Sequence, residues 1–107
     1  MALYLKNKKK IETIFEKGFT IKADGLLFKG YDFKDDEIKY GVSVSKKLFP
    51  LAVDRNLIKR REKEQAKSVK LAEFIAKGVS FFLIYTSKQV LDSNEIKRSV
   101  EGLSKKL

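Results

Sequence analysis

The spacing of apolar residues predicts strands in the middle and in the last third of the chain. Between residues 38 and 45 apolar and polar residues alternate, so one face of this strand is apolar and the other carries only small or polar groups. Another group can therefore approach the second face of the strand closely. Residues 79–86 form a continuous apolar run, which is typical of a strand buried on both faces. Residues 26–31 also read as a strand, and residues 19–23 as a short extended segment.

Apolar residues at helical spacing predict three helices. The first covers residues 7–17, and we expect Gly18 to end it in the left-handed conformation. A long second helix is expected from about residue 51 to residue 77, with Gly78 as its stop. The third occupies residues 92–107 and begins with a capping-box pattern.

The order of these elements predicts an α+β fold. Helix, two or three strands, helix, strand and helix fit a two-layer α/β sandwich, in which three helices pack on a small mixed sheet of three or four strands. We expect the helices to cover one face and to leave the other partly open. A length of 107 residues suits one domain, residues 1–107, and no linker or repeat interrupts it.

The charge and composition of the chain favour some classes of function and exclude others. The chain has 24 Lys or Arg against 14 Asp or Glu, a net charge of +10, which predicts a polyanionic partner: nucleic acid first, an anionic membrane surface second. It has no His and no Cys, which excludes imidazole catalysis, thiolate metal sites and disulfides. The first ten residues have the reverse of a signal peptide's charge order, and no apolar segment is long enough to span a membrane, so we expect a cytoplasmic protein.

The second predicted helix separates its charges from its apolar residues. At 100° per residue its cations fall within an arc of about 140°. These are Arg55, Lys59, Arg60, Lys63, Lys67 and Lys70. The apolar residues opposite are Val53, Leu57, Ile58, Val69, Leu71, Ala72, Ile75 and Ala76. Like charges four residues apart destabilise a helix unless a polyanion is near, which favours a binding surface over the alternative of an ordinary solvated face.

Arg61 falls in the apolar arc, where burial of a bare guanidinium is costly. Either the helix is poorly packed there, or Arg61 reaches a cleft that holds an anion. Most aromatic residues are expected in the core, but Phe15 and Tyr31 are candidates for stacking on bases. The acidic residues 35–37 are interpreted as a turn, with a divalent-ion site as the alternative.

Two segments resemble a known family. Gly-Val-Ser-Val-Ser-Lys-Lys at 41–47 and Ala-Val-Asp-Arg-Asn-Leu-Ile-Lys-Arg at 52–60 are similar to the signature of the bacterial ribonuclease P protein subunit, and the order of elements matches over nearly the whole chain. The resemblance implies a fold like that of ribosomal protein S5, with a left-handed βαβ crossover around the long helix. Leu57 stands where the family has a second Arg, with Arg61 one turn later, and Glu62 replaces an apolar or aromatic residue.

The resemblance also implies a function. The family's protein is the non-catalytic subunit of an endoribonuclease: it binds the catalytic RNA and the 5′ leader of precursor tRNA, and the RNA holds the Mg²⁺ and cuts the leader off. One protein per RNA is expected, with no DNA or membrane partner, no catalytic residue and no metal site on the protein. The residues expected to bind RNA are Lys46, Lys47, Arg55, Asn56, Lys59, Arg60, Arg61 and Lys63. The residues expected in the leader cleft are Phe15, Tyr31, Ser43 and Ser45.

Three other functions remain open at this point. A general RNA-binding or ribosome-associated protein would use the same basic helix without any role in cleavage. An autonomous metal-dependent nuclease would use Asp35, Asp36 and Glu37 and would cut RNA unaided. A helix lying on a membrane surface is the most distant alternative, because its apolar side is needed by the core.

Overall fold

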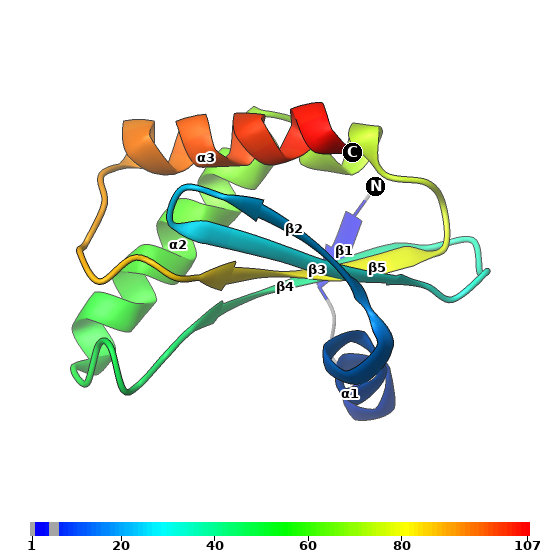
Figure 1. Cartoon of the computed structure of the whole chain (residues 1–107), viewed down its shortest axis with the longest axis horizontal. Helices are drawn as coiled ribbons and strands as arrows, with labels where there is room; N and C mark the ends of the chain where they lie inside the picture. The colour runs from blue at the N-terminus through cyan, green and yellow to red at the C-terminus, as the bar shows by residue number, and fades with distance from the viewer. Residues whose placement is uncertain (1, 5–6) are drawn as a thin grey trace.

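The computed structural model describes residues 2–4 and 7–107, with side chains described for residues 7–107. Its strands form one five-stranded mixed sheet in the order β1-β4-β5-β3-β2 (Figure 1). The strands are β1 (Ala2–Tyr4), β2 (Phe19–Ala23), β3 (Leu26–Asp32), β4 (Ile38–Val44) and β5 (Val79–Tyr85). The helices are α1 (Lys8–Lys17), α2 (Ala52–Ser68), the 3₁₀ turn η1 (Leu71–Phe74) and α3 (Ser93–Lys106).

The α+β class and the mixed sheet are confirmed. Neighbouring strands β4 and β5 are parallel and are joined through α2, while β2, β3 and β5 pair antiparallel. This parallel pair is the crossover that the resemblance implies; its hand stays a prediction. Strand β1 pairs parallel with β4 and adds a fifth strand that the apolar pattern did not predict.

The helices lie on both faces of the sheet. Figure 1 shows α3 above the sheet and α1 below it, while α2 runs diagonally behind the β2–β3 hairpin. Buried residues of α2 and α3 belong to the same core cluster. The expectation that all helices cover one face is therefore wrong for α1. Its buried residue Ile14 packs with Phe82 of β5 in a small second cluster, so that helix covers part of the face opposite α2 and α3.

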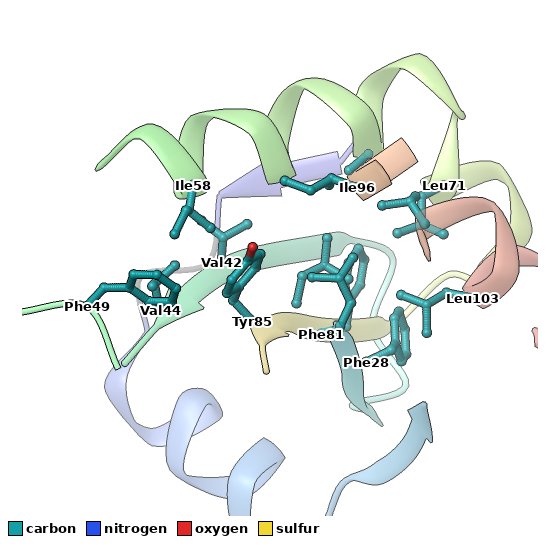
Figure 2. Packing of buried hydrophobic residues seen from close by; sticks show 14 residues of the cluster. Phe28, Val42, Val44, Phe49, Ile58, Leu71, Phe81, Tyr85, Ile96 and Leu103 are labelled. Atoms are coloured by element: carbon teal, nitrogen blue, oxygen red, sulfur yellow. The ribbon is translucent and has the colours of Figure 1, made fainter. Parts of the chain in front are cut away.

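The main core lies between the sheet and the pair α2–α3. Figure 2 shows side chains of alternating strand positions meeting Ile58 of α2 and Ile96 of α3. The rings of Phe28 and Phe81 stack with centroids 4.7 Å apart, and Phe81 in turn stacks on Tyr40 at 5.6 Å. The fully buried pattern predicted for the strand at 79–86 is confirmed, since all but one residue of β5 is buried.

Helix α2 ends nine residues before the predicted stop at residue 77. Its 17 residues span about 25 Å, close to the length of the seven-residue strands beneath it, so a longer helix would overshoot the start of β5. Lys70 turns the chain in the left-handed conformation at φ 57°, and η1 then carries Leu71 into the core. The predicted apolar side is also wrong at Val53, which is 78% exposed.

The helix starts follow the predicted caps, whereas Gly18 serves a different purpose. The side chain of Asn7 accepts hydrogen bonds from the N–H groups of Lys9 and Lys10, and Asp92 accepts one from Glu95 at 2.8 Å. Gly18 is extended at φ −68° rather than left-handed. A side chain at Gly18 would collide with the backbone carbonyl of Ile14, so glycine is needed there for close approach. Among the described residues, no helix has the length and apolar character to cross a bilayer.

Candidate nucleic-acid interface

The sheet face beside α1 is partly uncovered, and its side chains form ordered rows. Lys29 of β3 and Gly41 of β4 both lie opposite Phe82 of β5. The adjacent row contains Leu27, Ile84 and Ser43. All three residues of that second row are only half-buried, so the open part of the face combines apolar surface with a hydroxyl group and a nearby cation.

Phe15 provides an exposed ring above this face. It is 40% exposed, and its ring centroid lies 5.3 Å from that of Phe82. Phe82 in turn lies over Gly41, where a side chain would collide with the ring. The close approach to the small residues of β4 that the sequence predicts is thus made by the Phe82 ring. Phe15 packs on that ring and keeps part of its own ring exposed for stacking.

The other predicted leader-cleft residues lie on or beside the same face. Tyr31 is half-buried against Phe33, with ring centroids 4.8 Å apart, in the cluster beneath α1. Ser43 is half-buried in the open row. Ser45 is exposed just past the end of β4, and its hydroxyl oxygen accepts a hydrogen bond of 3.1 Å from the N–H of Lys47. Phe15 and Ser45 are therefore exposed, whereas Ser43 and Tyr31 are half-buried.

The segment between β4 and α2 presents two cations at the end of this face. Lys46 and Lys47 are exposed in a turn, while Phe49 is buried with its ring centroid 5.7 Å from that of Tyr85. The guanidinium of Arg55 donates hydrogen bonds to the carbonyl oxygens of Phe49, at 2.8 Å, and Pro50, at 2.9 Å. Arg55 therefore holds the turn that carries the two lysines, in addition to any contact that it makes with a partner.

One side of α2 carries a row of polar and basic residues. Helical spacing places Asn56, Lys59, Lys63 and Lys67 on that side, next to the buried residues Ile58 and Ala66. Arg60 is exposed farther round the helix and forms an ion pair of 3.8 Å with Glu64. The predicted basic arc is thus present over residues 55–67, but Lys70 lies beyond the helix.

Arg61 has a structural partner that the sequence did not indicate. Its guanidinium donates a hydrogen bond of 2.6 Å to the carbonyl oxygen of Leu91, in the segment that leads to α3. The hydroxyl of Tyr85 accepts a hydrogen bond from the N–H of Leu91 at 2.9 Å, and it donates one to the carbonyl of Gln89. Arg61 therefore helps to fix the loop after β5, and the expected poor packing or anion cleft is not needed to explain it.

Glu62 is the unusual residue of α2. It is 0% exposed, and neither of its carboxyl oxygens has a hydrogen-bond partner. Burial raises the pKa of Glu62 from its usual 4.5 to about 9, although the positive charge of Lys59 acts in the opposite direction. The carboxyl is therefore protonated at neutral pH, and it belongs to the core rather than to a site that contacts solvent.

The acidic residues 35–37 form a turn in which the carboxylates of Asp35 and Glu37 have cationic partners. Asp35 forms an ion pair of 2.8 Å with Lys10, whose ammonium also lies 4.9 Å from the centroid of the Phe33 ring. The hydrogen bond from Lys10, followed by one from the backbone N–H of Glu37, lowers the pKa of Asp35. Within residues 2–4 and 7–107, no group of three or more His, Cys, Asp or Glu residues lies close enough together to hold a metal ion.

Sequence reasoning missed two cations on the open sheet face. Lys29 lies opposite Phe82, and Lys22 of β2 lies opposite Leu27, so both belong to the face that carries Phe15. The alternation of residues along β2 and β3 indicates which side chains share a face, since side chains two positions apart lie on the same side of a strand. It does not indicate which face of the sheet stays open, because that depends on where α1 packs.

Comparisons with known proteins agree with this architecture. The model of the family described as Ribonuclease P matches residues 2–107. The RNase P protein of Staphylococcus aureus is 26% identical, with 98% of this chain and 94% of that chain covered and a TM-score of 0.78. The RNase P protein from Thermotoga maritima has the same fold at 21% identity, with coverages of 97% and 96% and a TM-score of 0.80. No curated protein sequence matches this chain.

Proposed function

The chain belongs to the Ribonuclease P family over residues 2–107, which implies a subunit of the ribonuclease P ribonucleoprotein and a role in tRNA processing, and on that premise we propose how it binds its RNAs. One surface contacts the catalytic RNA, and another binds the 5′ leader of precursor tRNA. The protein thereby aids endonucleolytic removal of the leader, while the catalytic RNA carries out the chemistry.

The leader binds on the open sheet face beside α1. The observation that carries this proposal is the exposed ring of Phe15, which is supported from below by Phe82 and bordered by the row of Ser43, Ile84 and Leu27. A base stacked on an aromatic ring gains about 1–3 kcal/mol whatever its identity, which suits leaders of varied sequence. Lys29 and the exposed pair Lys46 and Lys47 would neutralise the leader's phosphates.

The catalytic RNA binds the basic side of α2 and the turn before it. The proposed contacts are Arg55, Asn56, Lys59, Arg60 and Lys63. Arg61 is proposed only as a secondary contact, because its guanidinium already binds the carbonyl oxygen of Leu91. Contact with six to eight phosphates would make assembly weaken by orders of magnitude between low and moderate salt, at about 0.7–0.9 units of slope per phosphate.

Over residues 2–4 and 7–107 no three His, Cys, Asp or Glu residues cluster closely enough to hold a metal ion, and the carboxylates of Asp35 and Glu37 form ion pairs with Lys10 and Lys39. We propose, as the family resemblance implies, that the catalytic RNA holds the Mg²⁺ that activates water. The protein's part is to bind the RNA and substrate phosphates and to fix the leader's path. One protein per catalytic RNA and a location in the cytoplasm belong to the same proposal.

Affinity for precursor tRNA against mature tRNA tests the leader site. In the assembled ribonucleoprotein, Phe15→Ala should weaken binding of precursor tRNA about 5- to 150-fold and leave binding of mature tRNA unchanged, since mature tRNA has no leader. Phe74→Ala is the matched control, because Phe74 is 52% exposed and belongs to η1, outside the open sheet face. Equal losses for both tRNAs would refute the leader site. A wild-type chain that binds structured RNAs without preferring a leader would instead indicate a general RNA-binding protein.

A further inference from the structure

An apolar pocket lies on the face of the sheet opposite to α1, where α2 ends. It has a volume of about 400 Å³, within the range of small-ligand sites. Its walls come from Ile38 and Tyr40 of β4 and from Ala66 and Ala72. Three charged residues, Lys67, Lys70 and Glu73, also line it. This pocket shares none of its lining residues with the open sheet face that carries Phe15.

The basic side of α2 leads to this pocket. Lys59, Lys63 and Lys67 follow one another at intervals of four residues, so they form a row of about 12 Å along one side of the helix. The last lysine of the row lines the pocket. A strand of RNA whose phosphates follow this row would therefore reach an apolar cavity at its end.

The turn after α2 adds a second cation at the same place. Lys70 adopts the left-handed conformation at φ 57°, which is uncommon for a residue with a side chain, and it lies on the pocket's lining with Lys67. Within residues 7–107, neither lysine has an acidic partner at ion-pair distance. Two exposed lysines against the one carboxylate of Glu73 leave the pocket's charged residues with a net positive charge. A positive rim beside apolar walls suits a ligand that is flat and apolar in one part and anionic in another.

We propose that this pocket binds one unstacked nucleobase of the partner RNA, with the adjacent phosphates on Lys67 and Lys70. The inference rests on the proposed RNA-binding function and adds to it a contact beyond the phosphate row. Burial of the base against Tyr40, Ala66 and Ala72 removes apolar surface from water, while the phosphates stay at the exposed rim. A ligand that bound only through its charge would not need the cavity, and a wholly apolar ligand would not need the two lysines. A nucleobase with its adjacent phosphates uses both.

The test compares an eight-residue oligoadenylate with an abasic oligomer of the same length and charge. Both are titrated against the full chain carrying Phe15→Ala, which removes the stacking ring on the opposite face. Adding Ala72→Leu to fill the pocket should weaken binding of oligoadenylate about tenfold and leave the abasic oligomer unchanged. Ala76→Leu is the matched control, because Ala76 is exposed and does not line the pocket.

A measurement on the parent chain keeps the test valid even if the filled variant folds poorly. Oligoadenylate should shift the methyl resonances of Ala66 and Ala72, and the abasic oligomer should shift them much less. Equal binding by the Ala72→Leu and Ala76→Leu variants, or equal methyl shifts with both oligomers, overturns the pocket while leaving the leader site intact. Failure of the wild-type chain to bind any RNA overturns the proposed function itself.

Discussion

Replacement of the buried acid Glu62 by Gln is expected to stabilise the protein at neutral pH. Burial raises the pKa of Glu62 from 4.5 to about 9, and no hydrogen bond compensates either oxygen. The folded state therefore holds a proton that the unfolded state releases above pH 4.5. Stability linked to this group is fully present below pH 4.5, falls as the pH rises, and is lost once the pH passes about 9.

The size of the effect follows from that shift. Each unit between the two pKa values corresponds to about 1.4 kcal/mol, so at pH 7 the wild type loses about 3 kcal/mol relative to low pH, and about 6 kcal/mol by pH 9. The total free energy of unfolding of a domain this size is about 5–15 kcal/mol, so the loss is easily measured. Glu62→Gln should match the wild type near pH 5 and exceed it by about 3 kcal/mol at pH 7.

Urea denaturation at pH 5, 7 and 8.5 measures this difference directly. The positive charge of Lys59 acts on Glu62. Burial raises the pKa of the nearby Tyr85 hydroxyl above its usual value, so that hydroxyl stays protonated over this range. Glu64→Gln on the exposed side of α2 is the control and should show no change of pH slope. A difference between Glu62→Gln and wild type that stays constant from pH 5 to 8.5 would show that Glu62 is ionised in the folded protein, against this reasoning.

Three further substitutions test individual contacts. Arg61→Ala removes the hydrogen bond to the carbonyl oxygen of Leu91, so it should lower the free energy of unfolding by about 1–2 kcal/mol. Amide hydrogen exchange in residues 86–91 should also become faster. Unchanged exchange there would contradict the role of Arg61 in fixing this loop. Gly41→Ala introduces a methyl group where the Phe82 ring lies, so it should displace the ring that supports Phe15. Precursor tRNA should then bind less tightly, while assembly with the catalytic RNA is kept. A binding assay that finds the affinity for precursor tRNA unaltered would count against the pair of rings. Arg55→Ala should weaken that assembly and reduce its salt slope by about one, and a slope equal to that of wild type would argue that the side chain only holds its turn.

The parts of the fold that depend on local chemistry could be predicted from the sequence. The caps at Asn7 and Asp92 each bind backbone N–H groups within three residues, and the alternation in β4 sets its faces by itself. Strand β1 could not be predicted in the same way, because its three residues form a strand only through pairing with β4. The end of α2 was also hidden, since Lys70 takes the left-handed turn without the glycine that usually indicates one.

The candidate nucleic-acid interface likewise combines residues that the sequence predicts with residues whose roles depend on contacts between distant segments. The sequence predicts Phe15 as a candidate for stacking on bases, and in the structure its side chain is 40% exposed and packs on the ring of Phe82. The partner of Arg61 lies 30 positions away in the sequence, so no local pattern indicates it. Lys29 escaped notice because the face on which it lies depends on where α1 packs. Contacts between distant segments decide these roles, and they become visible only in the folded chain.

Processing of precursor tRNA at low Mg²⁺ is the most direct test of the central claim. A bacterial ribonuclease P RNA, a precursor tRNA with its 5′ leader and this protein are combined, with the protein or the RNA left out in parallel. The proposed function predicts leader removal that is faster with both components than with the RNA alone, and none with the protein alone. Cleavage by the protein without the RNA, or no gain when the protein is added, would contradict it.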